Sequence, residues 1–190
     1  MAKVRESSLI ASKLRGMVGD ELVFRRRKGE TIVAARPDLD PNRKPTPAQL
    51  AQQERFRQGA IYAQKMMAAP EDKAAYTAEA EGTTGTAFSV AVRDFLSLPE
   101  VADVDLSAYT GAAGSTIMVT ATDDTAVMGL HVRIEQMDGT LVEEGEAVQV
   151  GHSAAWVYTT TAANPTAACK VTVTAVDRPG HQAVKTETKG

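Results

Sequence analysis

Residues after Pro99 alternate between apolar and polar side chains with a period of two, which restricts that part of the chain to β-strands. The alternation runs through the stretches STIMVTATDD, GLHVRIEQMDGTLVEEG, AAWVYTTTA and CKVTVTAVDRPG. A period of two places every second side chain on the same face of a strand. The expected apolar faces consist of Ile117, Val119 and Ala121; Leu130, Val132 and Ile134; and Cys169, Val171, Val173 and Ala175.

Turn signals separate these stretches at regular intervals. Asp138 and Gly139 in the stretch MDGT form the dipeptide that favours a tight hairpin turn. Seven or eight short strands with regularly spaced turns predict a β-sandwich of immunoglobulin type. The single tryptophan, Trp156, is expected to anchor the core of that sandwich.

The preceding stretch has helical signals. Thr46 suits an N-cap, Pro47 suits the first helical position, and Gln49 completes a Thr-x-x-Gln capping box. These signals predict a helix over 47–67, and a second helix is expected to start at Pro70. A third helix is expected in TAFSVAVRDFLSL, with one apolar side formed by Phe88, Val92, Phe95 and Leu96.

A β-hairpin is expected near the start of the chain, between Gly16 and Arg36. Two short apolar runs, ELVF and TIVAA, flank the polar stretch RRRKGE, which contains a Lys-Gly turn. A two-stranded hairpin alone is only marginally stable in water. Its apolar residues are therefore expected to form an assembly interface, composed of Leu22, Val23, Phe24, Ile32 and Val33.

The net charge of −3 conceals an uneven distribution. Residues 1–60 carry thirteen Lys and Arg against seven Asp and Glu, whereas 61–190 carry eight against seventeen. The basic surplus centres on a patch composed of Arg25, Arg26, Arg27 and Lys28. Clustered cations suit phosphate binding, so a nucleic-acid-associated protein is one alternative. The same cations at a hairpin tip also protect strand edges from aggregation.

These patterns together predict an α+β chain in three parts. The parts are a hairpin arm with a proline-rich connector over 1–45, a small helical domain over 46–100, and an all-β immunoglobulin-like sandwich over 101–190. Because the arm cannot bury its apolar residues alone, it is expected to pack on another part of the protein or on a neighbouring copy.

No motif for catalysis or for a cofactor occurs in the sequence, so we expect neither. The only cysteine, Cys169, lies in a predicted strand and is expected to be a buried hydrophobe. Acidic residues at the sandwich turns, Asp123, Asp124 and Asp177, offer oxygen ligands for calcium, but their spacing fits no defined loop. The acidic residues Glu143, Glu144 and Glu146 are expected to form a solvated hairpin edge.

No apolar run approaches the roughly 18 residues of a membrane span. The first residues, MAKVRESSLIASKLRG, lack the apolar stretch of a secretory signal. We therefore expect synthesis in the cytoplasm without a signal peptide, followed by incorporation into a particle or appendage.

Two stretches resemble known bacterial families. The run GSTIMVTATDDTAVMGLHVRIEQMDGTLVEEG, with the ending VTVTAVDRPGHQ, is similar to bacterial immunoglobulin-like repeats. The run MVGDELVFRRRKGETIVAARP, leading into PTPAQLAQQERF, resembles an uncharacterised bacterial family in which a hairpin precedes a TPAQ helix. The first resemblance implies a sandwich used in adhesion, spacing or assembly, and the second implies no activity.

The sequence thus favours a non-enzymatic structural subunit that forms a homo-oligomer, such as a ring, a filament or a phage-like or appendage-like particle. One alternative is the nucleic-acid-associated protein described above. Another is a monomeric immunoglobulin-like binding module. Glycan recognition by such a module would call for exposed aromatics, and Trp156 and Tyr158 are the aromatics that follow Tyr109.

Overall fold

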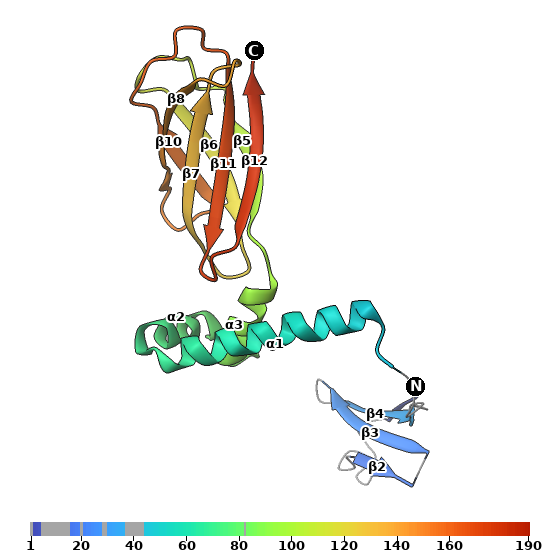
Figure 1. Cartoon of the computed structure of the whole chain (residues 1–190). Coiled ribbons are helices and arrows are strands. Elements are labelled where there is room, and N and C mark those ends of the chain that lie inside the picture. Colours follow the sequence, from blue (N-terminus) through green and yellow to red (C-terminus); the bar gives the residue numbers. More distant parts are fainter. Residues whose placement is uncertain (1, 5–15, 20, 28–29, 37–43, 82) are drawn as a thin grey trace. The chain divides into compact units, whose positions relative to one another are not determined.

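A computed structural model describes residues 2–4, 16–19, 21–27, 30–36, 44–81 and 83–190. The chain separates into two compact units, Met1–Thr46 and Pro47–Gly190. Each unit is described by itself below, and Figure 1 labels the helices and most of the strands.

The first unit contains a four-stranded antiparallel sheet, rather than the hairpin alone. Strands β3 (Leu22–Arg27) and β4 (Glu30–Ala35) pair as the sequence predicts. Two short strands, β1 (Ala2–Val4) and β2 (Gly16–Val18), extend this hairpin on either side. The strand order is β1-β4-β3-β2. Neither short strand was predicted, because a three-residue strand is too short to show a period.

Three helices begin the second unit. They are α1 (Pro47–Ala68), α2 (Pro70–Ala80) and α3 (Ala87–Leu96), in agreement with the predicted starts. Helix α3 begins at a capping box in which Thr86 and Ser89 exchange hydrogen bonds. Its buried residues Val90, Ala91, Val92 and Asp94 extend around several sides, because α3 packs against both α1 and α2. Phe88, predicted on the apolar side, is instead exposed.

Eight strands follow within residues 100–190, and they form the two sheets of a sandwich. Strands β5 (Glu100–Asp105), β6 (Thr116–Thr122), β10 (Ala155–Thr159) and β9 (Val148–Gln149) make one sheet, in the order β5-β6-β10-β9. Strands β12 (Gln182–Lys189), β11 (Cys169–Asp177), β7 (Val127–Glu135) and β8 (Leu141–Glu146) make the other, in the order β12-β11-β7-β8. When the eight strands are lettered in chain order as A, B, C, C′, D, E, F and G, these are the sheets ABED and GFCC′ of an immunoglobulin-type sandwich.

The sandwich core matches the predicted apolar faces. All ten predicted residues of β6, β7 and β11 are buried, and Trp156 and Tyr158 of β10 lie in the same cluster. The fold class predicted from the sequence, α+β with an immunoglobulin-like sandwich, is confirmed.

Glu143 differs from its predicted role on a solvated edge. Its Oε2 accepts hydrogen bonds from the backbone nitrogens of Thr161 and Ala162, at 2.9 and 3.1 Å, and from Thr161 Oγ1 at 2.8 Å. Its Oε1 is buried. Glu143 therefore fixes the loop that follows β10, at the end of the sandwich opposite the helices (Figure 1).

Candidate functional site

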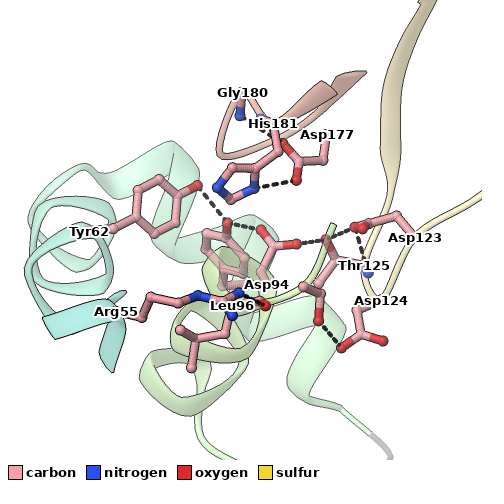
Figure 2. Close-up of polar contacts among 12 residues, drawn as sticks. Arg55, Tyr62, Asp94, Leu96, Asp123, Asp124, Thr125, Asp177, Gly180 and His181 are labelled. Atoms are coloured by element: carbon pink, nitrogen blue, oxygen red, sulfur yellow. Dashed lines mark hydrogen bonds and ion pairs between the residues drawn. The ribbon is translucent and has the colours of Figure 1, made fainter. Parts of the chain in front are cut away.

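A buried polar network joins the helices to one end of the sandwich. Asp94 on α3 is fully buried. One of its carboxylate oxygens accepts a hydrogen bond from the hydroxyl of Tyr76, and the other accepts one from the hydroxyl of Thr125 in the β6–β7 loop. Tyr76 also bonds to Tyr62 at 2.8 Å between the hydroxyl oxygens. Figure 2 shows Asp94 between the aromatic side chains of the helices and the loop of the sandwich.

The turn between β11 and β12 adds a second connection to the helices. The guanidinium carbon of Arg178 lies 4.9 Å from the centre of the Tyr76 ring, a cation–π contact. The ring of His181 packs edge-on against Phe95, with 5.3 Å between the ring centres. Asp177 holds this turn by accepting hydrogen bonds from the backbone nitrogens of Gly180 and His181, at 2.7 and 2.6 Å.

Exposed polar contacts surround this buried network. Asp124 accepts a hydrogen bond from Ser97 at 2.7 Å and lies 3.4 Å from the Arg93 guanidinium. Arg55 on α1 donates to the carbonyl of Leu96 at 2.9 Å, at the end of α3. We name the set Tyr62, Tyr76, Asp94, Thr125 and Arg178, of which Tyr76 and Asp94 are buried and the others half-buried, the helix–sandwich junction.

Burial dominates the acid–base chemistry of the junction. Burial raises the pKa of Asp94, and the nearby carboxylates of Asp123 and Asp177 add to this increase, whereas the hydrogen bonds from Thr125 and Tyr76 oppose it. Burial also raises the pKa of Tyr76, and its hydrogen bond to Asp94 raises that pKa further. Tyr76 is therefore a neutral hydrogen-bond donor, as its bond to Asp94 requires.

The raised pKa of Asp94 predicts a pH dependence of stability. In the folded state Asp94 keeps a proton that the unfolded chain has already released, so its contribution to stability falls as pH rises. The fall begins near the usual carboxyl pKa of 3.8 and levels off above the raised folded value. Chemical unfolding of wild type and D94N, followed by Trp156 fluorescence, gives the free energy of unfolding of each at a series of pH values. We expect the value for wild type to fall relative to that for D94N as pH rises. A difference that grows in favour of wild type with rising pH would contradict the assignment.

The three acidic turn residues that could offer oxygen ligands for calcium each have protein partners. Asp123 accepts from the backbone nitrogen of Thr125 at 3.1 Å, Asp124 contacts Arg93 and Ser97, and Asp177 holds its own turn. Among the described residues, no group of three or more His, Cys, Asp and Glu side chains is arranged to hold a metal ion. The junction thus consists of groups that bind one another, and its chemistry is that of a fixed connection between helices and sandwich.

The predicted assembly residues lie on both faces of the N-terminal sheet. Because side chains alternate along a strand, Leu22 and Phe24 share one face with Val33, whereas Val23 shares the other with Ile32. All five are exposed or partly exposed. Strand β2 adds an apolar residue to each face, Met17 to one and Val18 to the other. The exposed fractions of Met17 and Val18 are 57% and 50%, and that of Leu22 on β3 is 41%. Among residues 16–19, 21–25, 31–36 and 44–46, whose side chains the structure describes, no apolar side chain is buried, whereas Thr31 is.

The basic patch follows directly on these residues. Arg25, Arg26 and Arg27 end β3, and Arg25 is exposed. Lys28 lies outside the described residues. Along β3 the arginines therefore follow apolar residues that include one aromatic, Phe24, whereas base stacking calls for a series of aromatics.

The aromatics of the sandwich belong to its core. Trp156 and Tyr158 are both buried. Their burial weakens the alternative of a glycan-binding module, which would call for exposed aromatics. Among the described residues, no helix is long and apolar enough to span a bilayer.

Comparisons with known proteins bear on the sandwich alone. No protein-family model matches the chain, and no curated protein matches it. Among solved structures, CopC from Methylosinus trichosporium OB3b is similar over 48% of this chain and 89% of its own, with 17% identity and a TM-score of 0.36. A conjugate transposon protein from Bacteroides vulgatus is similar over 48% of this chain and 82% of its own, with 12% identity and a TM-score of 0.25.

These likenesses concern about half of the chain and assign no family. The strand order and the buried core define the class: an immunoglobulin-type sandwich that follows three helices and a separate four-stranded sheet.

Sequence reasoning missed Asp94, the centre of the junction. A signal was present, because Val90 and Asp94 are four residues apart and therefore share one side of a helix. An acidic residue on an apolar helix side is rarely buried without partners. Its partners come from distant positions, Tyr76 and Thr125, which the local pattern does not connect to it.

Proposed function

We propose that this protein is a non-enzymatic structural subunit that assembles with copies of itself through its N-terminal sheet. One observation carries the proposal: apolar side chains lie on both faces of the sheet, and those that the structure describes are exposed or half-buried. Sheets are normally packed against another layer on at least one face. Covering apolar surface contributes roughly 25 cal/mol per Å². An uncovered sheet of this kind therefore gains free energy from a partner.

The charge distribution supports another copy of the chain as that partner. Residues 1–46 carry eleven Lys and Arg against six Asp and Glu, whereas 47–190 carry ten against eighteen. The first unit is therefore positive by five charges, and the second is negative by eight. Opposite charges on two units of one chain favour attraction between the arm of one copy and the body of the next.

The fixed junction suits a subunit that transmits position along an assembly. The helices cover one end of the sandwich, and the opposite end, with the loop held by Glu143, points away from them (Figure 1). A contact between unlike surfaces repeats head to tail, and it closes into a ring or grows into a filament. In such an assembly the sandwich would serve as a spacer or as an adhesive surface displayed outward.

Sedimentation velocity and electron microscopy of the full-length protein test the role of the arm. The double variant L22D/F24D places two carboxylates on one face of the sheet, and we expect it to sediment as a monomer. The control V184D changes a more exposed valine, 62% exposed against 41% for Leu22, on the outer face of the sandwich, and it should assemble as wild type does. Retention of the wild-type assembly by L22D/F24D would refute the role of the arm.

A further inference from the structure

The outer face of the sheet β5-β6-β10-β9 carries an uncovered apolar row. In the register of this sheet, Met118 pairs with Val157, and Val157 pairs with Val148. Residues that pair directly across adjacent strands share a face, so these three side chains form one row across the sheet. Met118 and Val148 are 52% and 72% exposed. An exposed apolar row on a flat sheet is typical of an interaction surface.

Acidic residues border this row. Asp105 pairs with Met118 at one end of it, and Asp103 and Glu100 pair with Thr120 and Thr122 further along β5. All three carboxylates are exposed. Glu100 and Asp103 form no ion pair with any residue that the structure describes. We name Glu100, Asp103, Asp105, Met118 and Val148, with Val157, the acidic sheet face.

The opposite sheet of the sandwich has a different outer face. There Arg133 forms ion pairs with Glu135 at 3.0 Å and with Glu144 at 2.7 Å, and Lys170 lies 4.0 Å from Glu135. Four of its charged side chains therefore lie in one connected group of ion pairs. The acidic sheet face thus combines an apolar row with two exposed carboxylates, Glu100 and Asp103, that form no ion pair among the described residues.

We infer that the acidic sheet face receives the N-terminal sheet of a second copy of this chain. The inference rests on the proposed function and specifies its receiving surface. Both surfaces are flat β-sheet faces with exposed apolar side chains, and such faces pack on each other about 10 Å apart. Their borders are opposite in charge: carboxylates on β5, and the arginines that end β3. The two surfaces differ from each other, so each copy offers one of each, and growth proceeds head to tail.

Two full-length variants and their mixture test this contact. The arm variant L22D/F24D keeps the acidic sheet face intact, and the face variant M118D/V148D keeps the arm intact. Each variant alone should be monomeric in sedimentation velocity. An equimolar mixture should form a heterodimer of about 40 kDa that grows no further, because only one productive contact remains. V184D is the control for an exposed substitution on the other sheet, and circular dichroism confirms that each variant is folded.

The outcomes separate this inference from the proposed function. A face variant that assembles as wild type does, while the arm variant stays monomeric, would overturn the receiving surface but leave the arm in its role. Two monomeric variants that fail to form a heterodimer would overturn the contact between arm and face. A monomeric wild type would overturn both proposals. If M118D/V148D fails to fold, E100K/D103K replaces it. At low salt, E100K/D103K should form less of the assembly than wild type does. An amount of assembly equal to that of wild type would overturn the inference.

Discussion

Replacing Asp94 by alanine is expected to lower the free energy of unfolding by about 2 kcal/mol, since the change removes the acceptor of one buried and one half-buried hydroxyl. These are the hydroxyls of Tyr76 and Thr125, which both donate to Asp94. An unsatisfied buried donor costs roughly 1–3 kcal/mol. The bond between Tyr76 and Tyr62 reduces the loss at Tyr76, and the contact of the Thr125 hydroxyl with Asp123 Oδ2, at 3.3 Å, reduces it at Thr125. Denaturant unfolding of the full-length protein, followed by Trp156 fluorescence, measures the change.

Two controls make the test of Asp94 specific. D94N keeps an acceptor oxygen, and its amide can donate to a rotated hydroxyl, so it should cost about 1 kcal/mol or less. D124A removes the exposed carboxylate of Asp124, which precedes Thr125 in the chain, and it should also cost less than about 1 kcal/mol. If D94A were no more destabilising than D124A, the junction would not hold the helices on the sandwich.

Replacing Gly111 by alanine is expected to have an effect of similar size at the other end of the sandwich. Gly111 has a φ of +81°, and an added Cβ would lie 2.6 Å from the carbonyl oxygen of Asn164 and 2.9 Å from the Cα of Ala167. Both neighbours are backbone atoms. The backbone nitrogen of Asn164 also donates a hydrogen bond to the carbonyl oxygen of Gly111, at 2.7 Å. Steric crowding of this kind costs about 1–3 kcal/mol, in addition to the strain of the positive φ.

Gly114 provides the matched control for Gly111. It has a φ of +86°, but an added Cβ would have nothing within 4 Å. G114A should therefore cost only the backbone strain, about 1–2 kcal/mol. Thermal unfolding of the two alanine variants separates strain from crowding, and equal losses of stability would show that the loop at Gly111 can move aside.

The sandwich could be predicted because its signal is local. Alternation along β6, β7 and β11 placed the core residues correctly, since one face of each strand is fully buried. The starts of α1 and α2 were also predictable, because Pro47 and Pro70 mark the first helical positions.

The parts that escaped prediction depend on contacts between distant residues. Strands β1 and β2 have three residues each and exist through pairing with β4 and β3. Asp94 and Glu143 are surface residues by composition, yet Thr125 and Thr161 reach them from other segments and allow their burial. Hydrogen bonds of this kind compensate for the desolvation of a polar group, and no local pattern encodes them.

The central claim is that the N-terminal sheet assembles copies of this chain, and the mass of the wild-type protein in solution tests it most directly. Light scattering over a range of protein concentrations measures that mass. The proposal predicts a weight-average mass that exceeds the 20.2 kDa of one chain and rises with concentration. A mass that stays at 20.2 kDa at every concentration would contradict it.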